Sequence, residues 1–184
     1  MTNSPTKGMK VLFVIASEGY QQVEYNVPKK ILQGTGIIVV TASDKPGGAV
    51  AKDKSTTIVD IPLDKVNIKD YAGIFLIGGP GALEHLDIPV THKLVYEAKN
   101  LGIPYGAICI SVRILAKAGV LQEKKATGWD ADKALRGILE GFGATYEEGK
   151  GMVTDGLVVT AVGPAVAEQF AQGIRRVLTK EKLD

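Results

Sequence analysis

The chain has 184 residues, of which 45% are hydrophobic and 23% charged, as in an ordinary globular protein of one domain. Its formal net charge of +2 provides no broad basic surface, so we expect neither nucleic acid nor a membrane as a partner. A single cysteine excludes an intrachain disulfide, and with only two histidines we expect no metal and no other cofactor. The lack of a signal-like or membrane-spanning apolar run favours a cytoplasmic protein.

Apolar runs and helical spacing divide the chain into alternating strands and helices. We expect a disordered polar leader over residues 1–9 and a single α/β domain over residues 10–184. Near-continuous apolar runs predict buried strands over residues 10–16, 37–42 and 71–77. Helices are predicted from Val23, over 90–99, from Asp130 and after Gly163-Pro164. Residues 43–61 predict a small β-hairpin excursion, and residues 152–162 predict a hairpin that turns at Asp155-Gly156. This alternation predicts a doubly wound, mainly parallel sheet sandwiched by helices.

Cys109, the only cysteine, lies where an apolar run starting at Ile103 gives way to a helix-compatible run. The small residues Ala107 and Ser111 stand two places before and after it. A nucleophile elbow requires this spacing, because larger side chains would collide as strand and helix close on each other. The first amides of the helix would then face the thiol and could stabilise a thiolate or an oxyanion. The alternative is a small buried cysteine without chemistry.

Glu24 falls on the apolar face of the first predicted helix, where a carboxyl group is costly without a partner or a task. Since proline suits a first helical turn, Pro28 places the start of the regular helix near Val23. Glu24 would then lie near the carboxyl edge of the sheet. The alternative is an idle glutamate that the helix dipole stabilises.

The third buried strand runs directly into Gly78-Gly79-Pro80-Gly81. A glycine pair at this point lets backbone amides turn inward at the edge where open α/β sheets bind ligands. The alternative is a tight turn and nothing more. Because Glu24, the glycines and Cys109 all follow strands, we expect their loops to converge in space.

These motifs together resemble the ThiJ/PfpI superfamily, the DJ-1-like proteins with a flavodoxin-like fold of the class I glutamine amidotransferase type. The resemblance spans residues 10–178 and is carried by KVLFVIA at 10–16, Val23-Glu24 with Pro28, LIGGPG at 76–81, Ala107-Ile108-Cys109, Asp155-Gly156 and Gly163-Pro164. It implies a reactive Cys109 beside a protonated Glu24, with backbone amides of Gly78, Gly79 and Ile110 completing the pocket. It also implies a homodimer or a higher homo-oligomer.

The sequence departs from the family pattern around the cysteine. Ile110 stands where the peptidase-like branch has a histidine, so no adjacent imidazole activates the thiol. Glu84 matches the glutamate of that branch's triad, but it has no histidine to orient. Trp129 stands where another branch supplies a histidine, and we expect Glu84 and Trp129 at the pocket or at an interface. His85 and His92 match no catalytic position, so we expect both on the surface.

The resemblance implies a cysteine-dependent, cofactor-free enzyme that acts on small 2-oxoaldehydes in the manner of a glyoxalase or deglycase. In this hypothesis the Cys109 thiolate adds to the aldehyde and Glu24 moves the proton between the two carbons. The second hypothesis is an oxidative-stress sensor or chaperone-like protein that uses oxidation of Cys109, favoured by the missing histidine bases. A cysteine peptidase is the weaker alternative because of Ile110, and a degenerate member with a structural role stays open.

Overall fold

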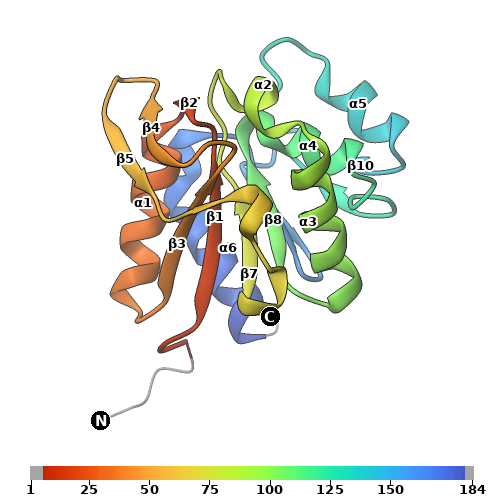
Figure 1. Cartoon of the computed structure of the whole chain (residues 1–184). Coiled ribbons are helices and arrows are strands. Elements are labelled where there is room, and N and C mark those ends of the chain that lie inside the picture. Colours follow the sequence, from red (N-terminus) through yellow and green to blue (C-terminus); the bar gives the residue numbers. More distant parts are fainter. Residues whose placement is uncertain (1–5, 181–184) are drawn as a thin grey trace.

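The computed structural model describes residues 6–180 (Figure 1). Of the leader predicted over residues 1–9, residues 1–5 lie outside this range, and residues 6–9 lie in and just after a turn. Thr6 is buried there, and the amide of Gly8 donates to the carbonyl of Gly36 at 2.9 Å. Within the described range, every helix is too short or too polar to cross a lipid bilayer.

A seven-stranded sheet forms the centre of the molecule. In spatial order its strands are β11 (Met152–Asp155), β12 (Val158–Ala161), β8 (Tyr105–Ile108), β7 (Gly73–Leu76), β1 (Lys10–Ile15), β3 (Ile38–Ser43) and β6 (Ile61–Pro62). All neighbours are parallel except the antiparallel pair β11–β12. Without β6 and β11, five parallel strands remain. Read across the sheet from β3 to β12, they are the second, first, third, fourth and fifth of these strands along the chain, which is the flavodoxin-like order. The predicted fold class is confirmed.

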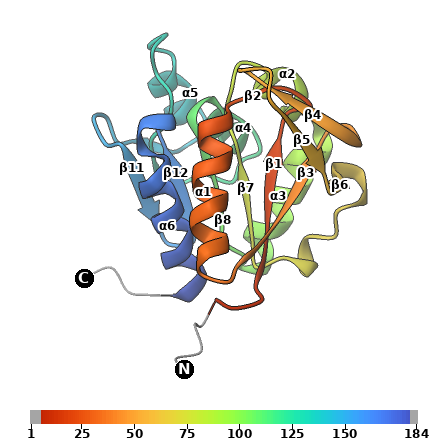
Figure 2. The same cartoon turned by 90° about the vertical axis from the view of Figure 1, so that its left-hand side faces the viewer.

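Helices cover both faces of this sheet, so its central strands are buried on both sides (Figure 2). Helices α1 (Gln22–Gly34) and α6 (Ala167–Thr179) lie on one face, and α3 (Pro89–Leu101) and α4 (Val112–Lys117) lie on the other. Double coverage explains why β1 is a continuous apolar run whose residues Val11 to Ile15 are fully buried. Phe75 packs edge-to-face against Phe13 and Phe170, with ring centroids 6.3 and 6.2 Å apart.

Smaller elements lie outside the main sheet. They are a three-stranded sheet of β2 (Glu18–Tyr20), β4 (Gly47–Ala51) and β5 (Thr56–Val59), a strand pair of β9 (Lys125–Ala126) and β10 (Thr145–Tyr146), and helices α2 (Ala82–Leu86) and α5 (Leu135–Gly141). The excursion predicted over residues 43–61 is confirmed as the antiparallel hairpin β4–β5.

One strand has no counterpart among the predicted elements, and one predicted boundary is corrected. Strand β2 has no strand pattern of its own and forms because it pairs with β4, a partner that no local pattern reveals. The helix predicted from Asp130 begins at Leu135. The Asp130 carboxylate accepts a hydrogen bond from the Leu135 amide at 2.8 Å, so it reaches the helix across an intervening turn.

Candidate active site

Cys109 directly follows β8, at the start of a short 3₁₀ turn that leads into α4. Its φ of +64° lies in the left-handed region, which a residue with a side chain adopts rarely. Ser111 donates a hydrogen bond to the carbonyl of Ile77 at 2.7 Å, which ties this turn to the end of β7. Ala107 and Ser111 are fully buried, so the turn has no space for larger flanking side chains.

Glu24, in the first turn of α1, is fully buried. Its Oε2 accepts a hydrogen bond from the Gly78 amide at 2.9 Å. Its Oε1 has no hydrogen-bond partner among the residues that the structure describes. Burial raises the pKa of this carboxyl to about 7, although interactions with Cys109 and the Gly78 amide and the charge of Lys52 lower it in part.

Gly78 allows the carboxyl and the cysteine to come together. A Cβ added at this glycine would lie 2.5 Å from the Cys109 Cβ and 2.7 Å from Glu24 Oε2. The neighbouring Gly79 has a φ of +126°, and a Cβ there would lie 2.3 Å from the Gly19 carbonyl oxygen. Close contacts therefore require glycine at both positions, and the backbone conformation requires it at Gly79 as well.

The thiol of Cys109 is half-buried. Burial raises its pKa to about 12, with a further upward contribution from the Glu24 carboxylate, whereas the amides of Ile110 and Gly79 donate to the sulfur and lower the pKa. Burial therefore favours the neutral thiol over the thiolate at rest. Glu24, with a pKa of about 7, is present in both protonation states at neutral pH.

A cavity of about 390 Å³ opens beside the thiol. It is lined by Gln21, Glu24, Lys52, Gly79, Pro80, Cys109, Ile110, Trp129 and Pro164. Of the site residues proposed from the sequence, the structure brings Cys109, Glu24, Gly79, Ile110 and Trp129 together around this space. Gly78 lies behind them, and its amide serves Glu24 rather than the sulfur.

Glu84 does not line this cavity. It is exposed on α2 and lines a neighbouring hollow of about 670 Å³. Sequence reasoning missed Gln21 and Lys52 as cavity residues. Gln21 comes three residues before Glu24 and could have been found as the residue that caps the predicted helix. Its side chain caps α1 by accepting a hydrogen bond from the Val23 amide at 3.1 Å. Nothing in the local sequence marks Lys52 as a cavity residue, because the pairing of β4 with β2 brings it to the site.

The expectation that both histidines lie on the surface is wrong for His85. Its side chain is only 14% exposed, and Nδ1 lies 3.0 Å from Asp44 Oδ2 and 3.3 Å from Ser17 Oγ. Both partners contact the same ring nitrogen, so this Ser17–Asp44–His85 cluster is not arranged as a catalytic relay. His92 is more exposed and contacts Asp87 at 2.8 Å. Neither histidine lines the cavity, and residues 6–180 hold no side-chain cluster suited to a metal ion.

Comparison with known proteins agrees with this geometry. Residues 9–176 match the DJ-1/PfpI family. The protein MJ0967 of Methanocaldococcus jannaschii is 34% identical over 175 residues, which are 95% of this chain and 84% of that one. Deglycase PH1704 of Pyrococcus horikoshii is 33% identical over 129 residues, covering 68% of this chain and 75% of its own. The crystal structure of a ThiJ/PfpI domain protein from Brachyspira murdochii superposes with a TM-score of 0.88 at 25% identity, covering 96% of this chain and 99% of its own. This chain belongs to the DJ-1/PfpI family.

Proposed function

We propose that this chain is a cofactor-free enzyme that converts small 2-oxoaldehydes into 2-hydroxy acids, with Cys109 as nucleophile and Glu24 as proton carrier. One observation carries the proposal: a buried carboxyl group with a pKa of about 7 lies beside the only thiol, in a cavity of about 390 Å³. A general base is most effective when its pKa lies near the working pH. The name of the relative PH1704, a deglycase, supports chemistry on reactive carbonyl compounds.

In the first step, the Cys109 proton passes to the Glu24 carboxylate as the sulfur adds to the aldehyde carbon. A base is needed because burial raises the pKa of the thiol to about 12, which leaves little thiolate at neutral pH. The amides of Gly79 and Ile110 face the sulfur and can donate to the aldehyde oxygen as it becomes negative. That oxygen then takes the proton from Glu24, which gives a hemithioacetal and restores the carboxylate.

In the second step, the Glu24 carboxylate removes the hydrogen from the former aldehyde carbon and delivers a proton to the neighbouring ketone carbon. The hemithioacetal hydroxyl proton moves to the ketone oxygen, so the product is the thioester of a 2-hydroxy acid. Water hydrolyses the thioester, releases the acid and restores the thiol. The hydrogen bond from the Gly78 amide to Oε2 holds the Glu24 carboxyl in place for both proton transfers.

The test is conversion of methylglyoxal to lactate, followed with a chiral lactate assay. We expect Cys109→Ser and Glu24→Gln each to lower kcat/KM by about 100-fold or more, because each removes a group that acts in the transition state. Glu168→Gln, at an exposed glutamate on α6, serves as the matched control and should behave as wild type. Wild-type protein without turnover would overturn the proposal, and full activity of Cys109→Ser would exclude the thiol route.

The pH dependence of the same reaction tests the base. Because Glu24 must be ionised to accept the thiol proton and its pKa is about 7, we expect kcat/KM to rise through about pH 7 and then level off. The residual rate of Glu24→Gln should lack this step. A wild-type profile that falls across the same range would contradict the role of Glu24 as a base.

A second candidate is a redox sensor. The observation in its favour is a half-buried thiol that faces two amide donors and has no histidine around its cavity, so the amides could hold the oxygens of a sulfinate. Intact mass after peroxide treatment should then show two added oxygen atoms in wild type and none in Cys109→Ser. The absence of a cavity histidine also disfavours a peptidase.

A further inference from the structure

Trp129 forms part of the wall of the Cys109 cavity, although it lies in a segment without helix or strand. This segment, residues 127–134, joins β9 to α5. The Trp129 amide donates a long hydrogen bond, 3.3 Å, to the Cys109 carbonyl. Because this part of the wall belongs to no sheet, its position depends on that one long backbone bond and on side-chain contacts.

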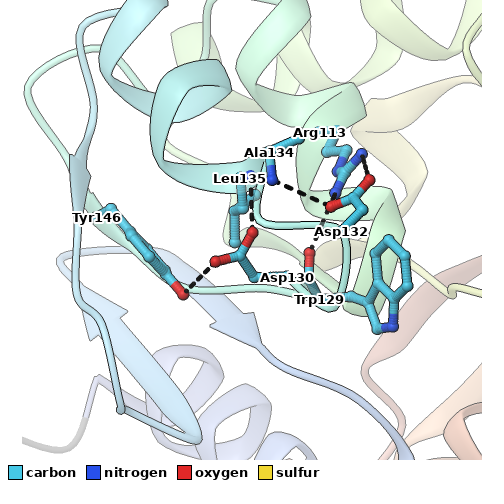
Figure 3. A network of polar contacts seen from close by, with 7 residues as sticks. All are labelled: Arg113, Trp129, Asp130, Asp132, Ala134, Leu135 and Tyr146. Carbon is cyan, nitrogen blue, oxygen red and sulfur yellow. Dashed lines mark hydrogen bonds and ion pairs between the residues drawn. The ribbon is translucent and has the colours of Figure 1, made fainter.

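Arg113 makes the principal side-chain contacts to this segment from α4 (Figure 3). Its guanidinium donates to both carboxylate oxygens of Asp132, at 3.0 and 2.6 Å, and to the carbonyl of Trp129 at 3.4 Å. The guanidinium carbon also lies 5.2 Å from the centroid of the Trp129 ring. The Arg113 guanidinium therefore contacts the backbone and the ring of Trp129, and it also pairs with Asp132 in the same segment.

Asp130 holds the same segment from its other side (Figure 3). One carboxylate oxygen accepts from the Leu135 amide at 2.8 Å, and the other accepts from the Tyr146 hydroxyl at 3.2 Å. These bonds tie the segment to α5 and β10. Trp129 is thus held between two fixed points, one on α4 and one on α5 and β10.

The burial of Arg113 indicates a specific role. Its side chain is only 8% exposed, and its Nε has no partner among the described residues, whereas the Asp132 side chain is 42% exposed. A buried cation is costly unless it is paired, and an apolar residue of similar size would often be at least as favourable for stability. What an apolar side chain could not supply is the bidentate link to the segment that carries Trp129.

We infer that Arg113 is a positioning residue: with Asp132 it holds the Trp129 ring as a fixed wall of the Cys109 cavity and so limits the size of the carbonyl compound that reaches the thiol. The limit on substrate size rests on the proposed function, whereas the positioning of Trp129 does not. Loosening the wall should admit bulkier reagents to Cys109 and should make the indole more accessible to solvent.

Two features of the composition make the test direct. Trp129 is the only tryptophan and Cys109 the only cysteine, so fluorescence and alkylation each report on one residue of this cavity. The variants are Asp132→Asn, which removes the charge at an exposed carboxylate, and Arg113→Met. Asp64→Asn, at an exposed carboxylate that pairs with Lys65, is the matched control.

We expect acrylamide quenching of Trp129 to increase in Asp132→Asn and Arg113→Met. We also expect alkylation by a naphthyl-substituted iodoacetamide to increase relative to iodoacetamide by about three-fold or more. Trp129→Ala, which removes the wall, should raise this ratio further, and Asp64→Asn should match wild type. Unchanged quenching and an unchanged ratio in a folded Asp132→Asn would overturn the inference, and that variant decides the question if Arg113→Met does not fold.

The substrate part has its own readout. If the wild type turns over methylglyoxal, Asp132→Asn should shift kcat/KM toward 2-oxoaldehydes with a branched alkyl chain, mainly through KM. A wild type without turnover would remove the proposed function and leave the quenching and alkylation results intact. An altered alkylation ratio with unaltered substrate preference would keep the positioning of Trp129 and overturn its part in substrate selection.

Discussion

The proton on Glu24 links the stability of the fold to pH. Burial raises the pKa of this carboxyl from 4.5 to about 7, so the folded chain holds the proton more tightly than the unfolded chain does. The stabilisation is complete below about pH 4.5 and is lost as the pH rises through about 7. The pKa difference corresponds to about 3 kcal/mol of unfolding free energy.

We therefore expect wild type to lose about 3 kcal/mol of unfolding free energy, relative to Glu24→Gln, between about pH 4.5 and pH 8. Urea unfolding followed by circular dichroism at several pH values measures this difference. The control Glu168→Gln changes an exposed carboxyl, so its unfolding free energy should depend on pH as that of wild type does. A constant difference between wild type and Glu24→Gln would mean that the carboxyl has an ordinary pKa in the folded state.

Cys109 and Glu24 could be proposed as candidate site residues from the sequence because each is marked by its immediate neighbours. Small residues flank the cysteine at elbow spacing, and the carboxyl stands out on an apolar helix face. Lys52 and His85 could not be placed in this way. Each owes its surroundings to a segment distant in the chain, Lys52 to the pairing of β4 with β2 and His85 to Asp44.

Strands β8 and β12 approach each other so closely at Gly106 that no side chain fits. A Cβ there would lie 2.1 Å from the carbonyl oxygen of Val159. In contrast, a Cβ at Gly137 in α5 would meet nothing within 4 Å, and this glycine has no left-handed φ. The same substitution should therefore have opposite effects in these two elements.

We expect Gly106→Ala to destabilise the fold by about 3 kcal/mol or more, because strand backbones must separate. Gly137→Ala should stabilise it by about 0.5 to 1 kcal/mol, since alanine is the better helix former and restricts the unfolded chain. Thermal unfolding of both variants beside wild type gives the comparison. A stable Gly106→Ala would show that the two strands lie further apart than described.

The Ser17–Asp44–His85 cluster joins the ends of β1 and β3 to α2. Burial raises the pKa of Asp44, but hydrogen bonds from Ser17, His85 and Ser43 lower it below its ordinary value on balance. The two strands were predicted from their apolar runs, whereas α2 was not. The connection between them was not predictable either, because hydrophobic periodicity carries no information about which polar loop residues meet. The short β2 and the late start of α5 escaped prediction for the same reason.

For the molecule as a whole, topology follows from a few strong local patterns. Strands buried on both faces, alternating with amphipathic helices, permit few arrangements other than a doubly wound sheet. Because parallel strands end at one edge, the loops after β1, β7 and β8 had to converge, and they do so at the Cys109 cavity. One wall of that cavity, Trp129, depends on residues 127–134, whose conformation no periodic pattern specifies.

The resemblance to DJ-1-like proteins predicts a homodimer or a larger homo-oligomer. Exposed apolar side chains, such as Ile58 on β5 at 79% exposure, are compatible with further association. Sedimentation equilibrium should give a mass of at least twice the 19.5 kDa of one chain. A single 19.5 kDa species across a wide concentration range would contradict this prediction.

The left-handed backbone at Cys109 means that loss of the thiol need not harm the fold. Glycine adopts this conformation freely, so Cys109→Gly would release about 1 kcal/mol of strain while it removes the thiol. Such a variant would be abundant in cells and invisible to chaperones and proteases, which detect unfolding and not lost chemistry. A library of this protein selected only for expression or heat resistance would therefore enrich glycine at this position, and the proposed function would be lost from it.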